Sequence, residues 1–119
     1  RALVLVSARL QADTSPRNPN AAAVRAYFGD DEDLYDARSP LTHAPRCPVP
    51  VMVAIAQYEN PLLDLYGLAF AQRIAQRDGV APRLLQCAGH NHMSIMAHFG
   101  AGEDLLGPEI LSFWGAVRG

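Results

Sequence analysis

Two short segments that are apolar throughout, residues 2–6 and 50–56, constrain the fold of this chain more than any other feature. Runs of this kind are typical of strands whose two faces are both covered, as in a parallel sheet. A third candidate strand covers residues 83–87, and a segment with helical apolar periodicity precedes it. Alternating strands and helices with short connections favour parallel strand–helix–strand units. We therefore expect an α/β fold with about three parallel strands and flanking helices.

Apolar periodicity and helix-stopping residues place the helices. The longest predicted helix opens with Pro61 near its first position and ends at Asp78-Gly79. Its buried stripe is expected to contain Leu63, Tyr66, Phe70 and Ile74. A shorter helix runs from an Asn20 cap to residue 28, and others are expected over residues 30–37, 94–98 and 107–117, with turns over residues 39–48. The last helix is expected to bury Ile110, Leu111, Trp114 and Val117.

The composition excludes several classes of function. With 119 residues, half of them apolar, the chain has the size of one small domain. A formal net charge of −2 provides no basic surface of the kind that binds nucleic acid or anionic membranes. No apolar run approaches the length of a membrane span. Cys47 and Cys87 are expected to be buried free thiols of a cytoplasmic protein rather than a disulfide.

The candidate catalytic groups lie in two loops that follow strands. Residues 57–61 contain Glu59, and residues 88–94 contain His90 and His92. Because the carboxyl ends of parallel strands meet at one edge of a sheet, we expect these loops to be neighbours. A carboxylate beside an imidazole accepts its Nδ1 proton and stabilises the imidazolium that forms during proton transfer. The alternative is a solvated loop carboxylate beside packed histidines, and the spacing alone leaves both interpretations open.

Two motifs carry a family resemblance. The first is Val51-Met-Val-Ala-Ile-Ala-Gln-Tyr-Glu-Asn-Pro-Leu-Leu-Asp64, which an amphipathic helix follows, and the second is Gly89-His-Asn-His-Met-Ser94. Together they resemble the last third of esterase and lipase-like α/β-hydrolases, in particular the small carboxylesterase and arylformamidase-like group. In that family the triad follows the chain order serine, acid, histidine. The resemblance covers nearly the whole chain and implies that residues 1–119 are the C-terminal part of a single α/β-hydrolase domain.

The resemblance places the triad acid at Glu59 and the triad base at His92. The acid of this family is more often an aspartate, which leaves Asp64 as a second candidate. His92 fits the histidine motif better than His90, because a hydrophobic residue and a small polar residue follow it. His90 then becomes a supporting or turn residue. These roles imply hydrolysis of a small ester or related acyl substrate, with no cofactor and no metal.

The family's nucleophile motif is missing from the sequence. No serine lies in a Gly-x-Ser-x-Gly pattern, which forms the nucleophile elbow at a strand-to-helix turn. Ser7 follows the first strand, but its neighbours do not form an elbow, and we expect it to be an ordinary loop residue. The chain is therefore expected to be inactive in acyl transfer by itself.

The segment after the first strand often forms part of the pocket wall in this family. Candidates for such contacts are Tyr27, Phe28, Tyr35 and Leu41, but we expect these side chains to serve in packing.

Two other functions compete with this interpretation. His90-x-His92 with Glu103 has a loose likeness to a cupin metal motif, whose ligands suit Zn²⁺ or Fe²⁺. The helical stripes argue against the jelly roll that a cupin requires. The second alternative is a binding or dimerisation module on a hydrolase-derived scaffold. An isolated half-sheet exposes its first strand and its apolar faces, which predicts association with a missing half or with a second copy. His43 and His98 stand alone and are expected to be surface or packed residues.

Overall fold

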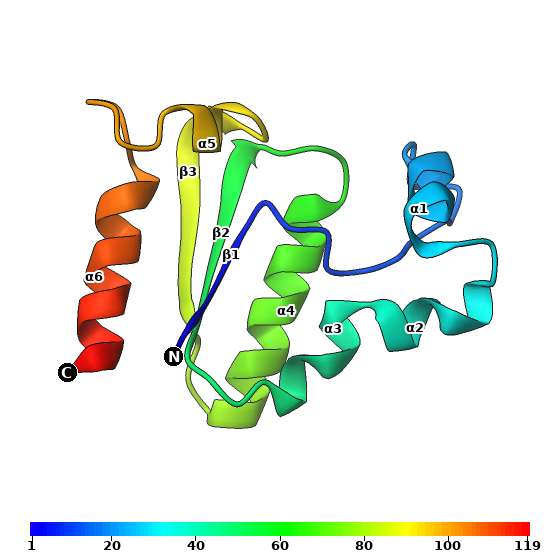
Figure 1. Ribbon diagram of the computed structural model, residues 1–119, viewed down its shortest axis with the longest axis horizontal. Coiled ribbons are helices and arrows are strands. Elements are labelled where there is room, and N and C mark those ends of the chain that lie inside the picture. The colour runs from blue at the N-terminus through cyan, green and yellow to red at the C-terminus, as the bar shows by residue number, and fades with distance from the viewer.

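Three parallel strands form the sheet in the computed structural model, which describes residues 1–119. The strands are β1 (Leu3–Val6), β2 (Val51–Tyr58) and β3 (Arg83–Asn91), and they lie side by side in the order β1-β2-β3. Helix α4 covers one face of this sheet and helix α6 the other (Figure 1). The expected α/β fold with three parallel strands and flanking helices is confirmed.

Six α-helices and two short 3-10 turns complete the chain. The α-helices are α1 (Ala21–Phe28), α2 (Tyr35–Arg38), α3 (Pro40–His43), α4 (Leu63–Asp78), α5 (Ser94–Ala97) and α6 (Leu106–Arg118). The 3-10 turns are η1 (Glu32–Leu34) and η2 (Ala44–Arg46). Helices α1 to α3 lie in the long connection between β1 and β2, to one side of the sheet (Figure 1). None of these helices combines the length and the apolar character needed to cross a membrane.

Strand β2 is the centre of the core. Its first six residues are all buried, because alternate side chains point to opposite faces and both faces are covered. Val51, Val53 and Ile55 pack with α4, whereas Met52 and Ala54 pack in a second cluster with α6. This two-sided burial explains why the segment is apolar without alternation.

Helix α4 packs closely on β2. The four residues of its predicted stripe are all buried, which confirms that face of the helix. Gly67 lies where a side chain would meet the sheet: a Cβ there would come within 2.9 Å of Ile55 Cγ2. The helix begins at Leu63, so Pro61 precedes it instead of opening it. Leu62 takes a positive φ of 69° before the first turn, and Gly79 ends the helix at a φ of 73°.

The buried face of α6 differs from the prediction. Leu111 is 73% exposed and Trp114 is 43% exposed, whereas Phe113 is buried. Ile110 and Val117 are partly buried against the second core cluster, as expected. The helix is rotated from the predicted orientation because its contact with the sheet is made through Leu106, Ile110, Phe113 and Val117.

The connection between β1 and β2 also differs in detail. Residues 40–46 form α3 and η2 where turns were expected. Asn20 precedes α1, but its side chain makes no capping hydrogen bond. Asn18 instead stabilises the turn before the helix: its side-chain oxygen accepts a hydrogen bond from Asn20 N–H at 3.0 Å, and its backbone carbonyl accepts one from Ala21 N–H at 3.2 Å. Both cysteines are free thiols, with Cys87 buried and Cys47 half-buried.

Both β2 and β3 extend beyond the residues predicted for them. β2 continues through Tyr58, and β3 continues to Asn91, so the expected turn at residues 89–92 begins as strand. The pairing shifts register between Ala56 and Tyr58, and Tyr58 pairs with Asn91. The Gln57 side chain accepts a hydrogen bond from Gly89 N–H at 2.7 Å across this irregular stretch. The residues that follow β2 and β3 therefore lie close together at the carboxyl edge of the sheet.

Candidate functional site

The carboxyl ends of the three strands gather polar side chains at one edge of the sheet. Ser7 follows β1, Glu59 follows β2, and His92 follows β3. Glu59 Oε1 lies 2.8 Å from His92 Nδ1, which confirms the expected proximity of the two loops. Glu59 Oε2 lies 2.6 Å from Ser7 Oγ. Each strand thus contributes one member of a continuous hydrogen-bonded network.

The Glu59 carboxylate accepts four hydrogen bonds. Besides His92 and Ser7, the backbone N–H of Ala56 donates to Oε2 and that of Asn60 donates to Oε1, each at 3.1 Å. Two carboxylate oxygens offer about four acceptor sites, so these donors fill its capacity. The Glu59 side chain is only 1% exposed, and solvent does not compete for these bonds.

These donors determine the charge of Glu59. Burial acts to raise the pKa of its carboxyl, because an ionised group loses solvation in the interior. The hydrogen bonds from Ser7, Ala56, His92 and Asn60 act in the opposite direction and outweigh burial, so the pKa lies below its ordinary value. Glu59 is therefore ionised at neutral pH and serves as an acceptor.

The charge of Glu59 in turn sets the tautomer of His92. An ionised carboxylate only accepts hydrogen bonds, so the neutral imidazole carries its proton on Nδ1. The lone pair of Nε2 is then available as a base, and Nε2 forms no hydrogen bond with any group of this chain. The His92 side chain is 33% exposed, so a reacting group can approach it. This arrangement can accept a proton at Nε2 and stabilise the resulting imidazolium.

The two alternative residues lie apart from this pair. Asp64 sits in the first turn of α4, is exposed, and accepts a hydrogen bond from Leu65 N–H at 2.8 Å. His90 Nδ1 lies 3.0 Å from Ser94 Oγ. The structure brings Glu59 and His92 together and leaves Asp64 and His90 outside the pair, whereas the catalytic role of the pair stays a prediction.

Ser7 was missed by the sequence analysis, which treated it as an ordinary loop residue. It is buried, its hydroxyl donates to Glu59, and its φ is +46°. The only signal in the sequence is a serine at the end of an apolar strand, which many loops share. The partner 52 residues away becomes visible only when β1 and β2 are paired.

None of the remaining serines is hydrogen-bonded to His92. Ser39 is fully buried, where its hydroxyl accepts from Ala12 N–H and donates to Tyr35 C=O. Ser94 contacts His90, and Ser112 contacts Arg83, the first residue of β3 at the strand end opposite to His92. No hydroxyl of this chain is hydrogen-bonded to the imidazole of His92.

The proposed metal ligands do not converge. His92 is engaged with Glu59, whereas Glu103 Oε2 lies 3.2 Å from His98 Nδ1. The rings of His90 and His98 meet edge to face at 5.2 Å, which agrees with the surface or packed role expected of His98. No group of three or more His, Cys, Asp or Glu side chains is placed to hold a metal ion. His43 contacts the backbone of α2 through Nε2, 2.8 Å from Ala37 O.

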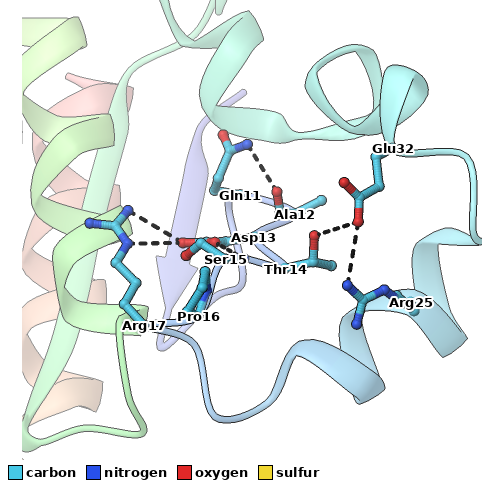
Figure 2. A pocket seen from close by; sticks show the side chains of 9 residues that line it. All are labelled: Gln11, Ala12, Asp13, Thr14, Ser15, Pro16, Arg17, Arg25 and Glu32. Carbon is cyan, nitrogen blue, oxygen red and sulfur yellow. Dashed lines mark hydrogen bonds and ion pairs between the residues drawn. The ribbon is translucent and has the colours of Figure 1, made fainter.

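A broad depression lies beside α1, but the chain satisfies its charges internally (Figure 2). Its lining residues are Gln11, Ala12, Asp13, Thr14, Ser15, Pro16, Arg17, Arg25 and Glu32. Arg17 pairs with Asp13 at 3.3 Å, while Arg25 and Thr14 converge on Glu32 at 3.4 and 2.9 Å (Figure 2). Each cation has a carboxylate partner, so the depression presents no uncompensated charge to a ligand.

Asp13 anchors this loop to α4. Its Oδ2 accepts a hydrogen bond from Tyr66 OH at 2.5 Å, and its Oδ1 accepts from Ser15 N–H at 2.8 Å. Burial acts to raise the pKa of Asp13, but the donors at Ser15 and Tyr66 and the charge of Arg17 lower it to about 2. Burial and the Asp13 carboxylate raise the pKa of Tyr66. These contacts fix the path of the chain after β1.

Three of the four side chains considered for a pocket wall pack in the interior of the protein. Phe28, Tyr35 and Leu41 are buried, and only Tyr27 is exposed. Phe28 and Tyr35 meet edge to face at 6.2 Å within a small cluster beside α1. Packing is therefore the observed role of three of these side chains.

Comparison with known proteins gives no family. The sequence matches no protein-family model and no curated protein.

Proposed function

We propose that Glu59 and His92 are the acid and the base of a serine-type carboxylic-ester hydrolase whose nucleophile lies outside these 119 residues. The observation that carries the proposal is the 2.8 Å hydrogen bond between a buried carboxylate and a partly exposed imidazole. It lies at the carboxyl edge of a parallel sheet, where α/β folds bind ligands. The motif resemblance to esterase and lipase-like α/β-hydrolases supports the same assignment, and with it the proposal that the chain is the C-terminal part of such a domain.

The proposed chemistry uses Nε2 of His92 twice in each half-reaction. Nε2 takes the proton of a serine hydroxyl while its oxygen forms a bond to the acyl carbon, and Nε2–H then protonates the departing alcohol. Water then repeats these two steps: His92 takes a proton from water while the water oxygen bonds to the acyl carbon, and the bond from this carbon to the serine oxygen breaks as Nε2–H returns the proton to that oxygen. The net reaction converts ester and water into acid and alcohol. Throughout, Glu59 holds Nδ1–H and stabilises the imidazolium.

The test is hydrolysis of short p-nitrophenyl esters by the protein in its natural full length. His92→Ala is expected to lower kcat by on the order of 10⁴-fold or more, because the base is removed. Glu59→Gln is expected to lower kcat by about 10⁴-fold, because an amide can donate to Nδ1 and favour the wrong tautomer.

His90→Ala is the matched control, since it removes an imidazole from the same sheet edge without touching Glu59. Its kcat is expected to stay within a few-fold of the wild type. Loss of activity in His90→Ala with activity retained in His92→Ala would assign the base to the other histidine. A full-length protein that hydrolyses none of these esters would refute the esterase proposal.

A second proposal, a binding or dimerisation module, is favoured by the open side of β1. This strand pairs only with β2, and its Leu3 and Leu5 line an apolar hollow on the α4 face, together with Phe70. An unpaired strand beside apolar surface is a site of association with another chain or segment. Light scattering that finds only monomers at all concentrations argues against it.

From the two free thiols we also infer a cytoplasmic location.

A further inference from the structure

Ser7 occupies an unusual backbone position at the end of β1. Its N–H still pairs with Ala54 C=O at 2.9 Å, as the last bond of the strand, but its φ of +46° turns the chain away from the sheet. Residues other than glycine take this region infrequently, since the Cβ is crowded there. Surrounding contacts therefore have to hold Ser7 in place, and glycine would satisfy the turn better. What serine adds to this position is its hydroxyl.

That hydroxyl contacts the carboxylate and not the imidazole. Ser7 Oγ donates to Glu59 Oε2, and His92 bonds to the other oxygen, Oε1. A serine nucleophile would give its proton to Nε2 of the histidine, on the side of the ring away from the carboxylate. Ser7 is therefore not placed as a nucleophile, although serine, glutamate and histidine are all present in one network.

The contact restricts the least constrained torsion of Glu59. Rotation about the last bond of a glutamate side chain is broad, so a carboxylate without partners samples many orientations. Two donors, the Ser7 hydroxyl and Ala56 N–H, fix Oε2. With Oε2 fixed, Oε1 is directed at Nδ1 of His92.

We propose that Ser7 is a positioning residue of the acyl-transfer site: its hydroxyl holds the Glu59 carboxylate in the orientation that keeps the His92 proton on Nδ1. This inference rests on the proposed function, because it matters for catalysis only if His92 is the base. The residues that directly follow the three strands, Ser7, Glu59 and His92, then all belong to the proposed site. Ser7 acts through Glu59 and touches no reacting atom.

The experiment compares Ser7→Ala and Ser7→Gly by NMR in the protein in its natural full length. The ¹⁵N shifts of neutral imidazoles report the tautomer of His92, and the ¹³C shift of the carboxyl carbon follows the titration of Glu59. In both variants the Nε2–H form of His92 is expected to appear at the expense of the Nδ1–H form. The Glu59 midpoint is expected to rise by about one pH unit, a tenfold change in proton affinity, because a charge-assisted hydrogen bond is lost.

The pair of variants separates the hydroxyl from the turn. Ser7→Gly accepts the positive φ without strain, so it keeps the test open if Ser7→Ala fails to fold. Ser112→Ala is the control, since it removes an exposed hydroxyl that contacts Arg83 and is expected to leave both signals unchanged. A purely structural role for Ser7 would change the stability of the chain but not the tautomer of folded molecules.

Glu59→Gln distinguishes failure of this inference from failure of the proposed function. If Glu59→Gln shifts the His92 tautomer while folded Ser7→Ala and Ser7→Gly keep the wild-type tautomer and Glu59 midpoint, Ser7 is not a positioning residue and the pair survives. If Glu59→Gln leaves the tautomer unchanged, the pair itself is refuted, and the role of Ser7 with it. A shift in all three variants supports both.

Discussion

Asp13→Asn is expected to destabilise the fold by an amount that depends on pH. Asp13 is 9% exposed in its side chain and accepts hydrogen bonds from Tyr66 OH and Ser15 N–H, with Arg17 beside it. Burial opposes its ionisation, but these partners lower the pKa from 3.8 to about 2. That difference corresponds to about 2 kcal/mol of free energy of unfolding at pH 7, which the neutral amide forfeits.

The sign of the pH dependence follows from the lowered pKa. The unfolded chain binds a proton at Asp13 more readily than the folded chain, so this stabilisation is fully present above pH 3.8. It decreases as the pH falls and is lost below about 2, where both states are protonated. At pH 3 roughly half of it remains, about 1 kcal/mol. The difference between wild type and Asp13→Asn should therefore shrink on acidification.

Urea unfolding followed by circular dichroism at pH 7 and at pH 3 measures this difference directly. Asp30→Asn is the matched control, because Asp30 is exposed and forms neither a hydrogen bond nor an ion pair; its effect should stay within about 0.5 kcal/mol. A cost of Asp13→Asn that is equal at the two pH values would show that lost packing, and not the ionised carboxylate, explains the destabilisation. A cost below about 0.5 kcal/mol at pH 7 would refute the anchoring role altogether.

Three further predictions concern packing and burial. Gly67→Ala is expected to destabilise the chain by about 1–3 kcal/mol in urea unfolding, because its Cβ would clash with β2, whereas Gly115→Ala in the open part of α6 should stabilise it slightly. Phe113→Ala should lower the free energy of unfolding by about 3–5 kcal/mol, and Trp114→Ala should lower it much less. The face of α6 predicted from the sequence, which buries Trp114, would give the opposite order. Burial, with a contribution from Asp104, raises the pKa of the Cys87 thiol, so this thiol should react with a chromogenic disulfide reagent only as fast as the chain unfolds.

Strand β2 could be predicted from the sequence because a strand that is buried on both faces is apolar at every position. Val51 to Ala56 pack in the two core clusters on opposite faces of the sheet, and none of them is polar. The orientation of α6 is harder to predict from the sequence, since Phe113 and Trp114 are adjacent and both are large and apolar. Which of the two is buried depends on how the helix lies on Met52 and Cys87, and no local pattern encodes that contact.

The candidate site was predictable to the extent that topology determines it. Parallel strands bring their carboxyl ends to one edge, and this is sufficient to expect Glu59 near His92. Glu59, and not Asp64, is hydrogen-bonded to His92, because α4 begins at Leu63 and Asp64 already belongs to its first turn, where it accepts from Leu65 N–H. The contribution of Ser7 depends on a positive φ and on a partner across the sheet, neither of which has a signature in the sequence.

The strand order explains why the carboxylate, and not another member of the network, is at its centre. β2 lies between β1 and β3, so the residue that follows β2 has neighbours on both sides. A carboxylate can use this position fully, because its two oxygens accept hydrogen bonds in different directions at once. Glu59 does so with Ser7 on the β1 side and His92 on the β3 side. An imidazole after β2 would have to divide its two nitrogens between these neighbours, and no nitrogen would remain free to act as a base.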